Sequence, residues 1–85
     1  MTSKGLHALN AIVNGYTNAR IKPEIAMEAV RRLLPVIARE EEIDERKRMG
    51  DFDGDDGECT EIVLRIRIEI ACEEIIAFTQ RAGSS

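Results

Sequence analysis

Alternating aspartates make residues 50–58 the segment of this 85-residue sequence with the clearest potential for chemistry. Asp51, Asp53 and Asp55 are each separated by one residue, within a run that reads GDFDGDDGE. Carboxylate oxygens at alternate positions of a loop are the ligands with which proteins surround a hard cation such as Ca²⁺. The three glycines disfavour a helix here, so we expect an acidic loop over residues 49–58 and treat these three aspartates as candidate metal ligands.

This loop resembles the start of an EF-hand calcium-binding loop over about a dozen residues. It departs from that pattern where the turn glycine belongs, which is Asp56 here, and where the closing carboxylate belongs, which is Ile62. Without the closing carboxylate, calcium affinity should be weak. We therefore interpret the segment as a solvated acidic turn and expect no cofactor. Weak calcium-dependent regulation is the alternative function.

Other residue patterns offer little for catalysis. His7 is the only histidine, and no motif supplies an activated nucleophile. Glu69 and Glu73 are four residues apart, and a second acidic pair facing them would resemble the carboxylate metal centre of helical nucleotide pyrophosphohydrolases. Arg65 shares their stripe and no matching acidic pair is apparent in the preceding helix, so we favour a salt-bridged surface. We expect no enzymatic activity, with nucleotide hydrolysis as a second alternative.

The charge and cysteine content narrow the class of protein further. Cys59 and Cys72 are the only cysteines, their spacing matches no zinc site, and we expect both to be reduced and buried. The net charge is −4 and both signs are interspersed, which disfavours nucleic acid as a partner. No apolar run is long enough to span a bilayer and no secretory signal is present, so we expect a cytoplasmic protein with no membrane partner.

Two helices are predicted in the first half of the chain. Apolar residues recur at helical spacing in residues 4–14, and Gly15 is suited to end that helix. Pro23 suits the first turn of a second helix, which we expect to continue to Arg48 with a bend at Pro35. The apolar stripe of the first helix consists of Leu6, Leu9, Ile12, Val13 and Tyr16.

The segment from Glu61 to Gly83 fits two templates. Between Ile62 and Ile70, apolar and charged residues alternate as in a half-buried strand. A strand has no partner elsewhere in the chain, and an equally regular helical repeat is formed by Leu64, Ile68, Ala71, Ile75 and Phe78. We predict an all-α single domain over residues 1–85, with a short N-terminal helix, a long helical hairpin and a disordered tail at 83–85. The alternative is an α+β fold with an intermolecular strand at 62–70.

An asymmetry within this hairpin predicts a homodimer or higher oligomer. Folding back the second helix places residues 39–48, which are almost all charged, opposite the isoleucine-rich residues 61–70. Each large aliphatic side chain contributes about 1.5–3 kcal/mol on burial, so leaving several in water would remove the stability margin of a small domain. We therefore predict that a second copy completes the helical bundle. The predicted oligomer interface consists of Ile62, Leu64, Ile66, Ile68, Ile70 and Ile75.

Acidic side chains before and within the loop form the predicted partner-binding surface, which would attract a protein with a basic surface. By size and charge alone, the chain resembles accessory proteins of bacteriophages and plasmids, many of which inhibit a host enzyme or defence complex. We expect a non-enzymatic binding protein that acts as such an inhibitor through protein–protein interaction. The predicted partner-binding residues are Glu40, Glu41, Asp44, Asp51, Asp53, Asp55 and Asp56.

Overall fold

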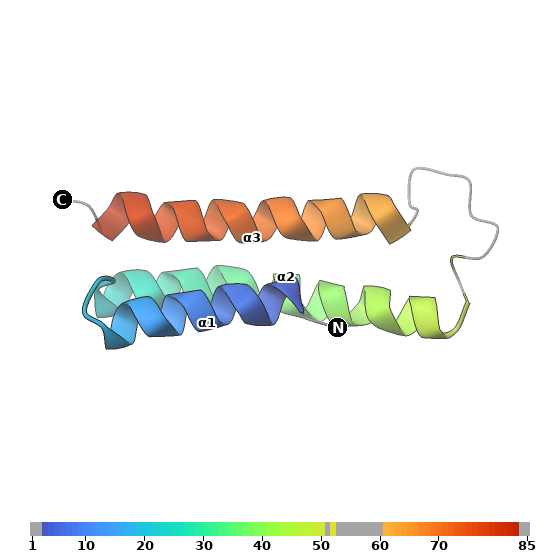
Figure 1. The fold of residues 1–85 in the computed structure, drawn as a ribbon, viewed down its shortest axis with the longest axis horizontal. Coiled ribbons are helices and arrows are strands. Elements are labelled where there is room, and N and C mark those ends of the chain that lie inside the picture. Colours follow the sequence, from blue (N-terminus) through green and yellow to red (C-terminus); the bar gives the residue numbers. More distant parts are fainter. Residues whose placement is uncertain (1–2, 51, 53–60, 84–85) are drawn as a thin grey trace.

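The protein is built from three α-helices in a computed structural model that describes residues 3–50, 52 and 61–83 (Figure 1). Helix α1 spans Lys4–Thr17, α2 spans Pro23–Arg48 and α3 spans Glu61–Gly83, and these described ranges contain no strand. The all-α prediction is therefore confirmed. Residues 62–70 are helical because a helix pairs its backbone groups within the segment, whereas a lone strand does not. Most of the predicted loop and tail lies outside the described residues.

Helix α1 continues beyond its predicted end and stops at Thr17. Gly15 is buried there against Ile21, and a Cβ atom on Gly15 would lie 2.4 Å from Ile21 Cδ1. The Gly15 carbonyl accepts hydrogen bonds from the N–H groups of Arg20 and Ile21, at 2.8 and 3.2 Å. Gly15 thus serves close packing instead of ending the helix, because a side chain here would displace the Ile21 side chain that packs against α1.

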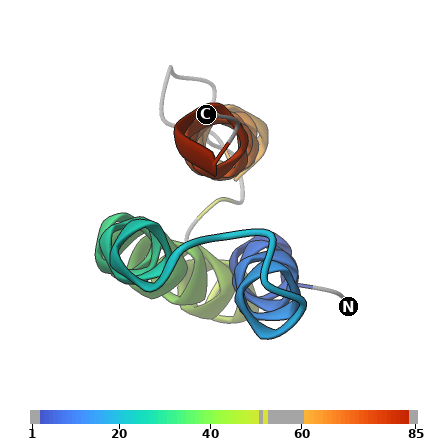
Figure 2. The same cartoon turned by 90° about the vertical axis from the view of Figure 1, so that its left-hand side faces the viewer.

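The helices form two layers. Helices α1 and α2 lie side by side and antiparallel, and α3 covers the groove between them (Figures 1 and 2). Helix α1 has 14 residues and α2 has 26, so α1 accompanies only the first part of α2. It covers the C-terminal half of α3, where His7 and Ala11 share a groove with Ala77 and Gln80. The end of α2 and the start of α3 therefore pair without a third helix.

The core is aliphatic and contains several small side chains. Leu33 of α2 and Ile12 of α1 are its largest fully buried side chains. Leu64, Ile76 and Phe78 are partly buried and pack against this centre. Small residues allow the helix axes to approach closely, which compensates for the low aromatic content. The buried hydrophobic residues are Ala8, Ile12, Ala26, Ala29, Leu33, Ile43, Ile68, Cys72 and Ile75.

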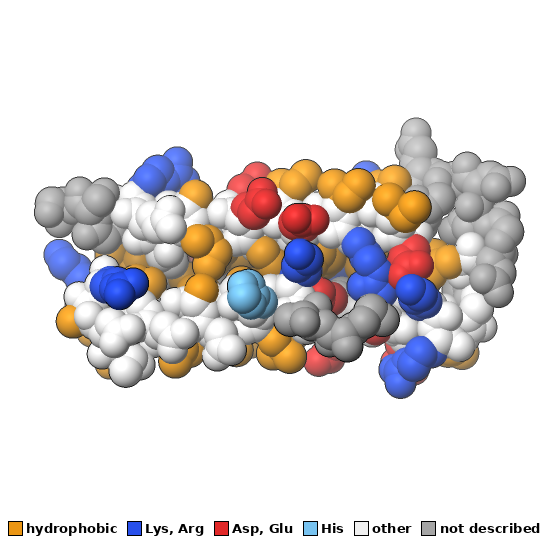
Figure 3. Space-filling model, in the orientation of Figure 1, with side chains coloured by type: hydrophobic (Ala, Val, Ile, Leu, Met, Phe, Trp, Pro, Cys, Tyr) orange, Lys and Arg blue, Asp and Glu red, His pale blue; other side chains and the backbone are white. Residues whose placement is uncertain are grey.

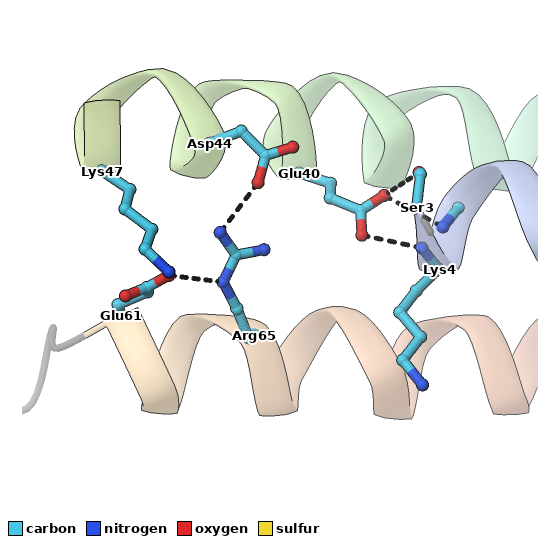
Figure 4. A network of polar contacts seen from close by, with 8 residues as sticks. Ser3, Lys4, Glu40, Asp44, Lys47, Glu61 and Arg65 are labelled. Carbon is cyan, nitrogen blue, oxygen red and sulfur yellow. Dashed lines mark hydrogen bonds and ion pairs between the residues drawn. The ribbon is translucent and has the colours of Figure 1, made fainter. Parts of the chain in front are cut away.

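A buried carboxylate joins α2 to the start of α1 (Figure 4). Glu40 is only 5% exposed and accepts hydrogen bonds from the N–H groups of Lys4 and Gly5, at 2.9 and 3.0 Å. The hydroxyl of Ser3, the N-cap residue of α1, donates to the same carboxylate. The first N–H groups of a helix have no acceptor within it, and this end of the helix carries partial positive charge. Glu40 therefore caps α1 from another helix.

Candidate functional site

The predicted oligomer interface on α3 divides into a buried part and an exposed part. Ile68 and Ile75 are 3% and 7% exposed and belong to the core of their own chain. Leu64 is half-buried and packs against that core. The assignment of Ile68 and Ile75 to a contact between copies is therefore corrected, because this side of α3 faces α1 and α2. Isoleucines occur around most of the circumference of α3, so they cannot all face one neighbour.

Ile62, Ile66 and Ile70 remain in contact with water and form what we call the α3 stripe. They are 72%, 49% and 48% exposed. Their spacing of four residues aligns them along one edge of the helix, on the side away from the core. Figure 3 shows a row of hydrophobic side chains along the half of α3 that follows the loop. This stripe is the part of the predicted interface that the chain does not cover itself.

A second apolar surface is formed by exposed residues of α1 and α2, and the groove at its centre has no residue of α3 in its lining. We call this surface the hairpin face. Helix α3 lies on one side of the layer that these two helices form (Figure 2). Each of its five large side chains is between 47% and 69% exposed. Leu6 and Val13 are seven residues apart on α1, as are Met27 and Leu34 on α2, so each pair shares one edge of its helix. The hairpin face consists of Leu6, Val13, Tyr16, Met27 and Leu34.

The hairpin face is concave at its centre. A groove of about 490 Å³ has Val13 and Tyr16 of α1 on one side and Met27 and Val30 of α2 on the other. Its lining contains no residue of α3, and Arg31 lies at the rim. A shallow apolar groove between two helices is the shape that holds a helix or peptide in many complexes.

The hairpin face was not predicted from the sequence, because helical spacing defines the apolar stripe of the first helix but not which of its residues a neighbour covers. Only Ile12 of that stripe is fully buried, whereas Leu6, Val13 and Tyr16 are exposed. The stripe has five apolar positions in eleven residues, which is the ordinary width of a core-facing stripe, so its width does not indicate a second surface.

The predicted acidic partner-binding surface is only partly present. Glu40 is not on the surface, because it caps α1, and its place in that surface is corrected. Glu41 is exposed, and Asp44 is half-buried against Arg65. Glu41, Asp44 and Glu45 line one shallow groove together with Lys47 and Arg48. The remaining predicted residues, which also include the proposed calcium ligands, lie outside the described part of the chain: Asp51, Asp53, Asp55 and Asp56.

An ion-pair network holds the start of α3 against the end of α2 (Figure 4). The Arg65 guanidinium donates through Nε to Glu61 at 2.7 Å and through Nη2 to Asp44 at 2.8 Å. Lys47 Nζ lies 3.3 Å from Glu61. The hydrogen bond from Arg65 lowers the pKa of Glu61 below 4.5, its ordinary value, and Lys47 acts in the same direction. Hydrogen bonds to Glu61 and Asp44 raise the pKa of Arg65.

Acidification is expected to weaken this network. Because the pKa of Glu61 is lowered on folding, its contribution to stability is present above about pH 4.5 and is lost as the pH falls through the folded-state pKa. Glu61→Gln should therefore lower the melting temperature at pH 7, and this loss should be smaller at pH 3, where more of the Glu61 carboxylate is protonated. Thermal unfolding followed by circular dichroism at both pH values checks this, with Glu42→Gln, outside the network, as the control. An equal effect of Glu61→Gln at both pH values would contradict the assignment.

A groove between α1 and α3 contains the residues considered for catalysis. Glu69 and Glu73 line it together with His7 and Cys72. Burial raises the pKa of the Cys72 thiol, which disfavours the reactive thiolate. Among the described residues, no group of three or more histidine, cysteine, aspartate or glutamate side chains is placed to hold a metal ion. Cys59 lies outside the part of the chain that the structure describes.

The surfaces above define a class of protein, a small three-helix bundle with an apolar face on each of its two layers. No protein-family model, no curated protein and no solved structure matches the chain. None of the three described helices is long and apolar enough to cross a bilayer.

Proposed function

We propose that this protein is a non-enzymatic helical binding protein that self-associates and acts by contacting another protein. The observation that carries the proposal is the α3 stripe, in which Ile62, Ile66 and Ile70 form a continuous exposed row. The row is unlike scattered surface hydrophobics, because its members are consecutive on one edge of one helix. Contiguous exposed apolar side chains mark interaction surfaces.

A second copy of the chain is the occupant that we propose for the α3 stripe. The edge of a single helix is convex, and two such edges pack against each other across a two-fold axis, as isologous dimers require. In each copy, the exposed surfaces of the three isoleucines add up to between one and two whole isoleucine side chains. Burying this surface from both copies in a dimer contributes about 5–10 kcal/mol. Association costs about 4–15 kcal/mol. The dimer should therefore have modest affinity and form at high protein concentration.

The acidic character of the chain supports a partner with a basic surface. The net charge is −4, and Glu41, Glu42 and Glu45 are all exposed near the end of α2. An acidic surface raises the rate at which a basic partner associates and makes that rate sensitive to salt. We propose that the protein acts as a phage- or plasmid-type inhibitor, which occupies a basic region of a host factor or defence complex. Its size, charge and exposed apolar faces support this role.

Self-association is tested by sedimentation over a concentration range from low micromolar to submillimolar. We expect the wild-type chain to shift from monomer to dimer within this range. Ile66→Lys should keep the protein monomeric throughout, since it places a charge at the centre of the stripe. Gln80→Lys adds the same charge at an exposed polar position of α3 and should leave the dimer unchanged. A wild-type chain that stays monomeric at the highest concentration would overturn the proposed self-association.

A further inference from the structure

The groove of the hairpin face has the shape of a helix-binding site. It runs between two antiparallel helices, with Val13 and Tyr16 of α1 on one side and Met27 and Val30 of α2 on the other. The residues that line it span 12–16 on α1 and 23–31 on α2, so it accommodates about two turns of a partner helix. Two concave faces leave a gap when they meet, whereas a convex helix fills the groove, so the groove fits a helix better than it fits a second hairpin face.

A second copy is excluded as the occupant by the position of the face. The α3 stripe is on the edge of α3 away from the core, whereas the hairpin face is formed by α1 and α2, the layer on the other side of that core (Figure 2). A dimer through the α3 stripe leaves both hairpin faces pointing outward. Further contacts between copies through those faces would add chains without end, because interfaces on opposite sides do not close. The occupant is therefore a different protein.

Charges beyond the groove define the chemistry of this partner. Glu41 follows Leu34 by seven residues and Glu45 follows Glu41 by four, so the edge of α2 that forms the hairpin face continues as an acidic edge. Glu41 and Glu45 are exposed and lie past the start of α1. Lys47 and Arg48 line the same shallow groove as Glu41 and Glu45, and Lys47 lies 3.3 Å from Glu61. Arg31 at the rim of the apolar groove is 3.7 Å from Glu28. The occupant thus needs an apolar stretch followed by positive charge.

We infer that the hairpin face binds an amphipathic helix of a partner protein, with apolar side chains in the groove and lysine or arginine side chains over Glu41 and Glu45. This inference rests on the proposed function and identifies the surface by which the chain contacts its basic partner. It is independent of the acidic loop. Helix-in-groove complexes use apolar residues at three- and four-residue spacing as anchors, and charge at one end sets the direction of binding.

The test uses two labelled synthetic peptides of about 16 residues. Both carry leucines at helical spacing; one ends in lysines and its twin ends in glutamates. Fluorescence anisotropy should show the wild-type chain binding the lysine peptide at least tenfold more tightly than the glutamate peptide. Met27→Glu, at an exposed groove position, should weaken binding about tenfold or more. Combined Glu41→Lys and Glu45→Lys should reverse the preference between the two peptides.

Ile66→Lys is the matched control, because it changes the α3 stripe and leaves the hairpin face intact. It should bind the lysine peptide like the wild type even when sedimentation shows it to be monomeric. The inference is overturned if neither peptide binds, if both bind equally, or if Ile66→Lys loses binding. It is also overturned if Met27→Glu abolishes self-association while Ile66→Lys does not, since a second copy then occupies the hairpin face. If the wild-type chain stays monomeric in sedimentation, the proposed dimer is overturned. The inference about the hairpin face is then decided by the peptide measurements.

Discussion

Replacing Leu33 with alanine is expected to lower the free energy of unfolding by about 3 kcal/mol or more. Leu33 is 0% exposed and lies at the centre of the core. Its truncation removes apolar contacts and leaves a cavity that helices held on two sides cannot fill completely. Small domains have a total stability that starts at about 5 kcal/mol, so the variant should be partly unfolded at moderate temperature. Urea unfolding followed by circular dichroism gives the difference directly.

Leu34 provides the matched control, since it is the same residue type at the next position. It is 55% exposed and belongs to the hairpin face. Leu34→Ala should change the free energy of unfolding by less than about 1 kcal/mol when measured at low concentration, where the chain is monomeric. Comparable losses from both substitutions would mean that α2 is rotated relative to the arrangement described. The core and the hairpin face would then both need to be reassigned.

Replacing Glu40 with alanine is expected to cost about 3 kcal/mol, because one substitution removes several charge-assisted hydrogen bonds. The N–H groups of Lys4 and Gly5 and the hydroxyl of Ser3 all lose their acceptor. Part of this cost is the desolvation of donors that are left without a partner near the buried end of α1. The loss should appear in urea unfolding as a lower midpoint. Hydrogen exchange of the first α1 amides should also become faster than in the wild type.

Two further variants separate the cap from a general charge effect. Glu41→Ala removes the same charge at an exposed neighbouring position and should stay within about 0.5 kcal/mol of the wild type. Glu40→Gln keeps one carbonyl oxygen as an acceptor but places an amide donor beside the backbone donors. Its loss in free energy of unfolding should therefore lie between those of Glu41→Ala and Glu40→Ala. If Glu41→Ala were as damaging as Glu40→Ala, net charge and not capping would explain the result.

The unequal lengths of the helices explain why apolar surface remains exposed. The first residue of α1, Lys4, lies beside Glu40 of α2. Helix α2 continues past this point to Arg48 without α1 beside it. Over this stretch, the start of α3 meets one helix through Ile43 and the Arg65 network and faces water on its other side. The α3 stripe lies in this thinner half of the bundle.

Local sequence features predicted three helices but not all of their ends. Pro23 lies at the first position of α2 as expected, since proline suits the start of a helix. The ambiguous segment after Glu61 is helical, in agreement with its three- and four-residue repeat. The end of α1 was predicted wrongly because Gly15 was interpreted as a stop signal. A glycine that ends a helix and a glycine that permits close contact look alike until the neighbouring chain, here Ile21, is in place.

By itself, the sequence determined the secondary structure, the aliphatic nature of the core and the presence of more exposed apolar surface than one small bundle can cover. These properties depend on residue type and spacing along the chain, which are local quantities. Only the tertiary structure decided which edge of each helix faces inward. It placed Ile68 and Ile75 in the core, left Ile62 in water and turned Glu40 from a surface acid into a cap for α1. A helical repeat defines a stripe, but the neighbour that covers it depends on contacts between residues far apart in sequence.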